Sequence, residues 1–121
     1  DQLGSPTSAL DIADGILEIC AQISSKGAAT TFGTYHMTGT GAATWADLAE
    51  FVFQIREQSG YMPVGVSRIP SSEYPTPVTR PQNSVLDCSK LESTFGISLP
   101  NWRRSTEKVV KRLLDEGTSG Q

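Results

Sequence analysis

The chain has 121 residues, of which 37% are hydrophobic and 19% charged, and its net charge at pH 7 is −3. These values are typical of one soluble globular domain, and the lack of a basic stripe argues against nucleic acid or an anionic membrane as a partner. No apolar run approaches the roughly 20 residues needed to span a bilayer.

The N-terminal part predicts a loop and then a helix. Gly4 and Pro6 interrupt residues 1–7, and Ser8 stands at capping distance before Asp11. Apolar residues then recur at helical spacing, so we expect a helix from Ala9 that ends within residues 24–27. The expected buried stripe of this helix consists of Ile12, Ala13, Ile16, Leu17, Cys20 and Ile23.

Two short strands are expected on either side of a second helix. Residues 34–38 and 64–69 are rich in β-branched or aromatic side chains. The helix between them begins at a Thr44 and Asp47 capping pair and ends at Ser59-Gly60. Its expected stripe is Trp45, Leu48, Ala49, Val52 and Ile55. Together these segments predict a right-handed βαβ unit.

The C-terminal part predicts two further helices. The first begins at an Asp87 cap or, as a rival start, at Ser89, and it ends at Gly96. The last helix begins at about Asn101 and ends at Gly117. The residues expected to point inward from it are Trp102, Val109, Val110, Leu113 and Leu114.

Few residues carry recognisable chemistry. We expect Cys20 and Cys88 to be free, buried thiols of a cytosolic protein, and the single histidine, His36, to be a satisfied strand residue and not a metal ligand. Asp11 and Asp14 indicate a solvated helix face. No catalytic constellation and no metal site are predicted.

The Gly39-x-Gly41 turn between a strand and a helix superficially resembles a dinucleotide fingerprint. The third glycine is missing, and no acidic residue follows at the expected distance. The favoured interpretation is therefore a tight turn in which glycine supplies an unusual φ.

A proline-rich run from Tyr74 to Asp87 is the most distinctive stretch of the sequence. Its prolines, Pro75, Pro77 and Pro81, fix φ, push the residues before them out of the α region and remove amide donors. The run is either a surface connector or a stiff segment that holds Arg80 and Asn83 against a ligand. The planar fork of arginine suits phosphate or carboxylate.

Several segments together resemble dTDP-4-dehydrorhamnose reductases, which are extended short-chain dehydrogenase/reductases. The similar segments, in chain order, are DQLGSPTSALDIAD at 1–14, YHMTG at 35–39, TWADLA at 44–49, EYPTP at 73–77, RPQNSVLD at 80–87, and FGI with LPNWR at 95–103. They span nearly the whole chain. Val78 is a mild departure, because this family usually has alanine after the second proline.

The resemblance implies an α/β fold in which residues 1–121 form a small C-terminal, substrate-binding lobe of about four helices and two or three short strands. It also implies an N-terminal Rossmann lobe, missing from this chain, with NADPH or NADH and a Tyr-x-x-x-Lys pair. No tyrosine here has lysine four residues later, and the chain opens at Asp1 without methionine, so we expect an inactive fragment of an enzyme.

The implied reaction reduces dTDP-4-dehydro-L-rhamnose to dTDP-L-rhamnose for cell-surface polysaccharide. The implied partners are a dTDP-sugar, the Rossmann lobe and, as a further option, a second copy in a homodimer, all in the cytoplasm. Arg80 and Asn83 are expected to seat the sugar nucleotide or to anchor the proline-rich run beside it. The cleft between the lobes is expected to be lined by Gln2, Ser5, Pro6 and Thr7.

Two main alternatives stay open at this point. One is the same lobe in another sugar-nucleotide epimerase or dehydratase. The other is a lobe of a non-catalytic regulatory subunit, such as that of methionine adenosyltransferase, which resembles these reductases. A free-standing interaction domain is a further, weaker alternative.

Overall fold

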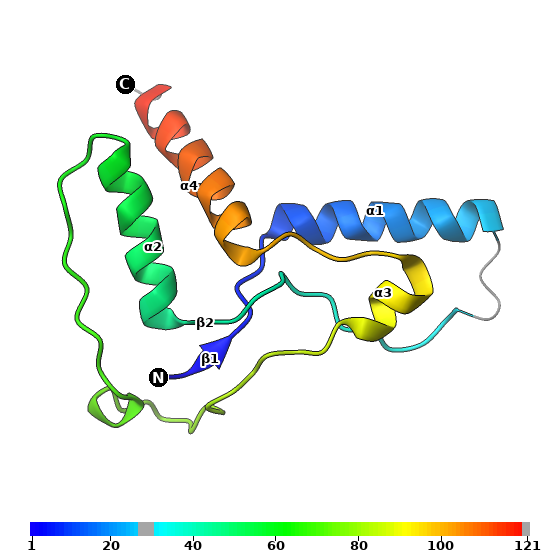
Figure 1. Ribbon diagram of the computed structural model, residues 1–121, viewed down its shortest axis with the longest axis horizontal. Coiled ribbons are helices and arrows are strands. Elements are labelled where there is room, and N and C mark those ends of the chain that lie inside the picture. Colours follow the sequence, from blue (N-terminus) through cyan, green and yellow to red (C-terminus); the bar gives the residue numbers. More distant parts are fainter. Residues whose placement is uncertain (27–30, 120–121) are drawn as a thin grey trace.

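The computed structural model of the protein describes residues 1–26 and 31–119. Its elements are β1 (Leu3–Gly4), α1 (Ala9–Lys26), β2 (Ala43–Thr44), α2 (Trp45–Gln58), a 3-10 turn (Ser71–Glu73), α3 (Ser89–Phe95) and α4 (Trp102–Ser119). Four helices and one two-stranded sheet in this part of the chain confirm the expected small α/β lobe. α2 and α4 lie side by side, whereas α1 extends away from them (Figure 1). None of the helices described is long and apolar enough to cross a membrane.

The sheet is antiparallel, so the predicted βαβ unit is wrong. Leu3 pairs with Thr44 and Gly4 with Ala43, which places the loop before α1 against the start of α2. Each strand has only two residues. Strands of two residues are too short to show an alternating pattern in the sequence. Their pairing depends instead on which distant segments meet in the fold.

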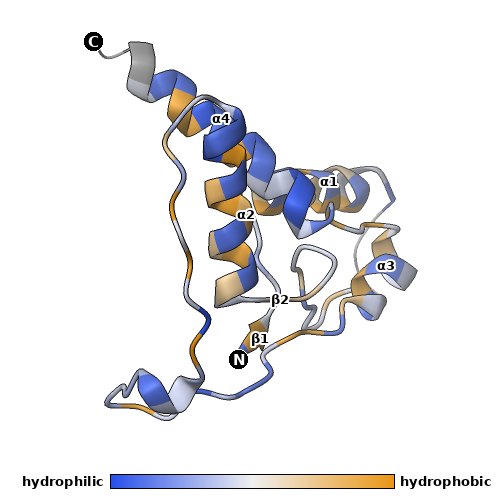
Figure 2. Ribbon diagram, turned by 60° about the vertical axis from the view of Figure 1, so that its left-hand side comes forward, coloured by the Kyte–Doolittle hydropathy of each residue, from blue (hydrophilic) through white to orange (hydrophobic). Residues whose placement is uncertain are grey.

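Residues 34–38 and 64–69 are not strands, contrary to expectation. Residues 34–38 do alternate: Tyr35 and Met37 are half-buried and pack against the core, while Thr34 and His36 are exposed. β-Branched and aromatic residues favour an extended segment with one buried face, but a strand also needs a neighbouring segment with which to form backbone hydrogen bonds. Residues 62–69, here called the strap, instead run past α2 without a partner strand (Figure 1 and Figure 2).

Local capping explains where the helices begin and end. Asp47 N–H donates to Thr44 Oγ1 at 3.1 Å and Thr44 N–H donates to Asp47 Oδ2 at 2.9 Å, which confirms the predicted capping box of α2. Gly96 ends α3 with a φ of 67°, in the left-handed region that glycine tolerates. α4 continues past Gly117, where its end was expected, to Ser119.

The start of α1 differs from the predicted capping box. Ser8 Oγ accepts a hydrogen bond from Leu10 N–H at 3.2 Å, whereas the Asp11 carboxylate accepts one from the Ser105 hydroxyl on α4. Ser105 is buried, so this contact joins two helices inside the lobe. The prediction of a solvated face therefore fails for Asp11, while Asp14 is exposed.

The core has two parts. The first surrounds Leu91, Ile97 and Leu99, against which partly buried residues of α1 and of the segment after it pack. The second surrounds Trp102, whose ring meets Phe51 of α2 edge-on at 5.5 Å between centroids. The other buried apolar residues are Ala43, Ile55 and Val110. The predicted inward positions of Trp102 and Val110 are confirmed.

The predicted stripe of α1 is only partly buried. Ile12 and Ile19 pack against the core, and Gly15 is buried because Met37 occupies the space where its side chain would lie. Leu17 is 68% exposed, and Ile16 and Cys20 are also exposed. Leu113 of α4, predicted to point inward, is exposed as well. The lobe therefore carries an outward apolar face on α1.

Both cysteines are free, as expected, but they are not buried. Cys20 is exposed and Cys88 is half-buried. Cys88 precedes α3, where its Sγ lies 3.4 Å from the Thr38 hydroxyl.

Gly39→Ala is expected to destabilise the protein by about 1–3 kcal/mol, the usual cost of overpacking. A Cβ at Gly39 would lie 2.6 Å from the backbone oxygen of Pro6, which cannot rotate away. Urea unfolding measures this change. Gly65→Ala is the matched control, because a Cβ there meets nothing within 4 Å. Equal midpoints for the two variants would contradict the proposed close approach.

Candidate functional site

Two adjoining cavities lie where β1, the start of α2, the strap and the proline-rich run meet. The larger has a volume of about 510 Å³ and the smaller about 310 Å³. Gln2, Trp45 and Arg80 line both cavities, so these three side chains occupy the boundary between them. Sites of this size commonly accept small organic ligands.

Four of the six residues predicted for the site meet at these cavities. Gln2 and Arg80 line both, and Ser5 and Pro6 line the smaller one. The first seven residues and the proline-rich run are far apart in sequence, and the fold brings them together at these cavities.

Thr7 and Asn83 line neither cavity and make structural contacts instead. The Thr7 hydroxyl donates to the Ser5 carbonyl at 2.9 Å and accepts from Gly39 N–H at 3.0 Å. Asn83 Oδ1 accepts from Val85 N–H at 2.9 Å. Thr7 therefore links residues 1–7 to the glycine turn, whereas the Asn83 contact forms a local turn within the proline-rich run.

Backbone hydrogen bonds seat the proline-rich run against β1. Leu3 N–H donates to the Gln82 carbonyl at 2.7 Å, and Ser84 N–H donates to the Leu3 carbonyl at 2.9 Å. The pairing begins only after Pro81, because the three prolines before that point cannot donate. It fixes Arg80 two residues before the first paired residue, Gln82, at the rim of both cavities.

Arg80 is the only cationic side chain that lines either cavity, and within residues 1–26 and 31–119 no hydrogen bond or ion pair involves it. The only acidic side chain there, Asp1, accepts hydrogen bonds from Ser71 N–H and the Ser71 hydroxyl. The Arg80 guanidinium is therefore available to an anionic ligand. Its planar fork suits a diphosphate or a carboxylate.

Trp45 is the residue that sequence reasoning missed. Its spacing from Leu48 placed it on the buried stripe of α2, but it is 67% exposed at the first helical position. Tyr74, also largely exposed, lines the larger cavity with it. The one available signal was position, because a residue at the first turn has no earlier turn of its helix to pack beside.

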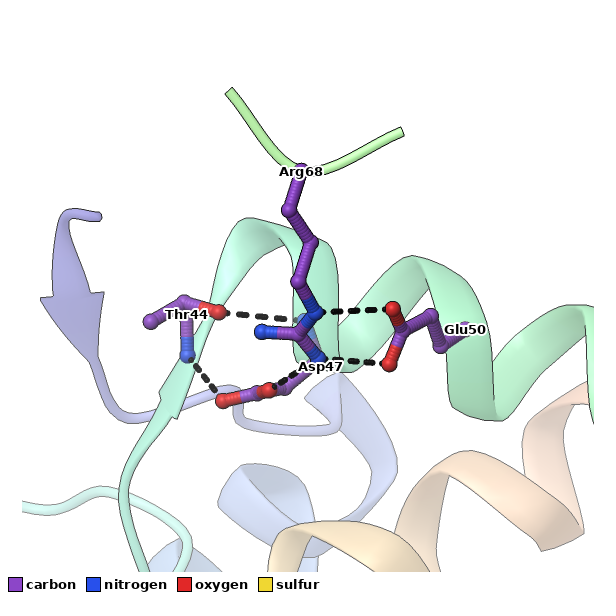
Figure 3. A network of polar contacts seen from close by, with 4 residues as sticks. All are labelled: Thr44, Asp47, Glu50 and Arg68. Atoms are coloured by element: carbon purple, nitrogen blue, oxygen red, sulfur yellow. Dashed lines mark hydrogen bonds and ion pairs between the residues drawn. The ribbon is translucent and has the colours of Figure 1, made fainter. Parts of the chain in front are cut away.

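Arg68 fastens the strap to α2 through two carboxylates (Figure 3). Its Nε donates to Glu50 Oε1 at 2.8 Å, and its Nη2 donates to Glu50 Oε2 at 2.5 Å and to Asp47 Oδ1 at 2.7 Å. For residues 62–69 the described structure has no backbone hydrogen bond to the rest of the chain. The strap forms a wall of the larger cavity, so Arg68 positions that wall.

These contacts stay charged at neutral pH. Hydrogen bonds from the Thr44 backbone amide and from Arg68 lower the pKa of Asp47 from its ordinary 3.8 to about 2. Hydrogen bonds from Arg68 also lower the pKa of Glu50. A depressed carboxyl pKa stabilises the fold above the unfolded value, and this contribution is lost as pH falls from about 3.8 through about 2. The clamp formed by Arg68 should therefore not titrate near pH 7.

Arg68→Met is expected to free the strap while leaving global stability nearly unchanged, because exposed ion pairs contribute little to unfolding free energy. Chymotrypsin should cleave after Tyr61 several-fold faster than in the wild type. Arg68→Lys should restore protection in part, since lysine offers a point charge without the fork. Glu107→Gln, which removes a surface pair with Lys111, is the control. Unchanged cleavage in Arg68→Met would refute the positioning role.

The glycine turn is not a phosphate cradle, which supports the tight-turn interpretation. Gly39 N–H donates to Thr7, and Thr40 N–H donates to the Pro100 carbonyl at 3.1 Å, so both amides are engaged within the protein. Gly41 has a φ of 82°, the conformation that required glycine. Among the residues described, no group of three or more His, Cys, Asp or Glu side chains is placed to hold a metal ion.

Known proteins are similar to this chain in sequence and in fold. The family model described as the RmlD substrate binding domain matches residues 1–115. The chain is 46% identical over 97% of its length to a dTDP-4-dehydrorhamnose reductase of Sinorhizobium fredii, and 43% identical over 96% to one of Burkholderia thailandensis. It spans about 40% of the length of these curated relatives.

Solved structures agree. A dTDP-4-dehydrorhamnose reductase of Clostridium acetobutylicum superposes with a TM-score of 0.80 at 31% identity, over 94% of this chain and 37% of that one. One from Bacillus anthracis, in complex with NADP, has a TM-score of 0.74 at 25% identity, over 88% of this chain and 34% of that one. With a family model matching nearly its whole length, the chain belongs to the RmlD substrate-binding domain family.

Proposed function

We propose that this chain is the substrate-binding part of a reductase that converts dTDP-4-dehydro-L-rhamnose to dTDP-L-rhamnose with NADPH or NADH. The observation that carries the proposal is the family match over residues 1–115 together with an unpaired Arg80 at the rim of two cavities. A nucleotide sugar offers the diphosphate that such a guanidinium favours.

The role of this chain is to bind and orient the sugar nucleotide. Holding a substrate in reacting geometry and excluding water both lower a barrier without any acid or base in the same lobe. Gln2, Ser5 and Pro6 line the cavities beside Arg80 and provide polar and apolar contacts there.

The nicotinamide cofactor belongs, in this proposal, to a Rossmann lobe N-terminal to residues 1–121. In the glycine turn that resembles a dinucleotide site, the Gly39 and Thr40 amides donate to Thr7 and Pro100. The residues present therefore do not fit the cofactor. When bound, the cofactor supplies the hydride. No tyrosine in the sequence has a lysine four residues later, so the proton donor is also assigned to that lobe.

The outward apolar face on α1 supports a partner lobe. Large apolar residues there stand more than 40% exposed: Leu10, Ile16 and Leu17. An apolar face of this kind typically marks an interaction surface. We assign it to the Rossmann lobe. A homodimer and a cytoplasmic location remain part of the same proposal.

The test uses the whole reading frame that contains this chain. The purified protein should oxidise NADPH or NADH only when dTDP-4-dehydro-L-rhamnose is present, and dTDP-L-rhamnose should accumulate in equal amount. Turnover of a different sugar nucleotide would favour an epimerase or dehydratase. Binding of a protein partner without any turnover would favour a regulatory subunit. Either result would overturn the proposal.

A further inference from the structure

Residues 62–81, here called the flap, form one wall of the larger cavity. The flap comprises the strap, the 3-10 turn and the first part of the proline-rich run, and it leads from beyond the end of α2 back towards β1 (Figure 1). Val66, Ile69, Tyr74 and Arg80 are among its residues that line the cavity. The remaining lining residues belong to residues 1–2 and to α2. The shape of the cavity therefore depends on where the flap is held.

Hydrogen bonds and ion pairs fasten the flap to the rest of the described chain at two residues only. The first is Arg68, which bonds to two carboxylates of α2 (Figure 3). The second is Ser71, whose N–H donates to Asp1 Oδ1 at 2.9 Å and whose hydroxyl donates to the same oxygen. The other hydrogen bonds of the flap are local, within the 3-10 turn and from Thr76 to Val78. A segment with so few ties opens easily.

Asp1 supplies a cap that the 3-10 turn lacks in its own sequence. The residue before the turn is Pro70, which makes no side-chain capping bond. Helical turns favour an oxygen-bearing side chain at that position, because their first amides have no partner inside the turn. The Asp1 carboxylate accepts from Ser71, the first residue of the turn. An acidic side chain distant in sequence thus determines where the turn sits.

The N-terminal segment holds residues 72–81 at both ends. Asp1 bonds to the residue before them, and Leu3 N–H donates to the carbonyl of Gln82, the residue after them, at 2.7 Å. Fixing both ends of a loop limits the conformations open to it. Arg80, which lines both cavities, lies inside this loop. Loss of the Asp1 contact would leave residues 69–81 without a tie between Arg68 and Gln82.

We propose that Asp1 is a positioning residue of the substrate cavity, which acts through Ser71 by holding the flap in place before the sugar nucleotide binds; this inference rests on the proposed function. A wall that is already ordered loses less conformational entropy when the ligand arrives, so affinity rises. The role needs an oxygen that accepts two hydrogen bonds, and the negative charge of Asp1 is not required for it.

The first experiment measures steady-state kinetics of Asp1→Ala and Asp1→Asn in the full-length protein. Asp1→Ala should raise KM for the dTDP-sugar about threefold to tenfold, with kcat and the KM for the cofactor unchanged. Asp1→Asn should stay close to the wild type, because the amide oxygen can accept both bonds from Ser71. Glu73→Ala is the matched control, since Glu73 is an exposed carboxylate of the same turn that lines neither cavity.

A double-mutant cycle tests whether Asp1 acts through Ser71. Ser71→Ala removes one of the two donors and should raise KM in part. Adding Ser71→Ala to Asp1→Ala should change nothing further, because the contact is already lost. Additive effects of the two substitutions would overturn the inference. So would an equal change of KM in Asp1→Asn and Asp1→Ala, which would assign the effect to the charge of Asp1.

A second readout does not depend on turnover. Glutamyl endopeptidase should cleave after Glu73, in the 3-10 turn, several-fold faster in Asp1→Ala than in the wild type or in Asp1→Asn, because a local opening exposes the turn. Glu107 on α4 provides the internal reference. Unchanged cleavage at Glu73 would refute the clamp. Equal acceleration at Glu73 and Glu107 would also refute it, since it would indicate loosening of the whole lobe.

The two proposals fail separately. If the wild type does not reduce the dTDP-sugar but Asp1→Ala speeds cleavage at Glu73 alone, the clamp on the flap stands and the reductase assignment falls. If the wild type reduces the dTDP-sugar and Asp1→Ala does so with the same KM, the reductase assignment stands and the positioning role is refuted.

Discussion

Arg80→Ala in the full-length protein is expected to raise KM for the dTDP-sugar about tenfold to a hundredfold. Hydrogen bonds to a charged group contribute about 1.5–3 kcal/mol, and each 1.4 kcal/mol is a factor of ten. Arg80 is the only cationic side chain at the two cavities, so no neighbour in this lobe can replace it. Because Arg80 has no ion pair in the described structure, its removal should leave the thermal midpoint unchanged.

Steady-state kinetics with varied dTDP-sugar at saturating cofactor measure this change. Arg80→Lys should recover part of the affinity, since lysine keeps the charge but loses the bidentate fork. Arg104→Ala is the matched control, because Arg104 is an exposed arginine of α4 that lines neither cavity. Unchanged KM in Arg80→Ala would rule out a substrate role for this residue.

The helices were predictable because their signals are local. The Thr44 and Asp47 pair marks the start of α2, and Gly96 marks the end of α3, in each case through atoms within a few residues. Side-chain periodicity then identified Trp102 and Val110 as inward-facing on α4. None of these predictions required knowledge of which segments meet.

The strand predictions were wrong because the pairing of strands depends on segments that are distant in sequence. Leu3 bonds to Gln82 and Ser84 on one side and pairs with Thr44 on the other, and nothing near Leu3 in sequence reports this. Residues 34–38 show the converse case. Their alternation correctly indicates one buried face, but in the described structure no backbone hydrogen bonds join them to a neighbouring strand.

The candidate site was partly predictable for the same reason. Gln2 and Arg80 were found through the prolines and the resemblance to the reductases, whereas the convergence of both on Trp45 depends on tertiary structure. Helical spacing assigned Trp45 to the core because spacing cannot detect that its side of the first turn is uncovered. The exposed side of α1, with Leu17, was missed in the same way.

Trp102→Ala is expected to lower the free energy of unfolding by about 3–5 kcal/mol, the range for deleting a large aromatic side chain from a core. Trp102, the first residue of α4, is buried against α2, and its backbone N–H donates to the Thr40 carbonyl at 3.0 Å. Its indole Nε1 is buried without a hydrogen-bond partner among the described residues. Trp102→Phe also removes that unsatisfied donor, so it should lower the free energy of unfolding by much less than the loss of ring volume alone would.

Urea unfolding of Trp102→Ala, Trp102→Phe and Trp45→Ala tests this assignment within one chain. The same tryptophan-to-alanine change should shift the unfolding midpoint strongly at position 102 and barely at position 45, because only the first ring leaves a cavity in the core. Substrate affinity should respond in the opposite order, provided that Trp102→Ala is assayed where it is still folded. If both alanine variants unfold at the same urea concentration, Trp45 is a structural residue whose side chain, exposed in this lobe, is buried by another part of the whole protein.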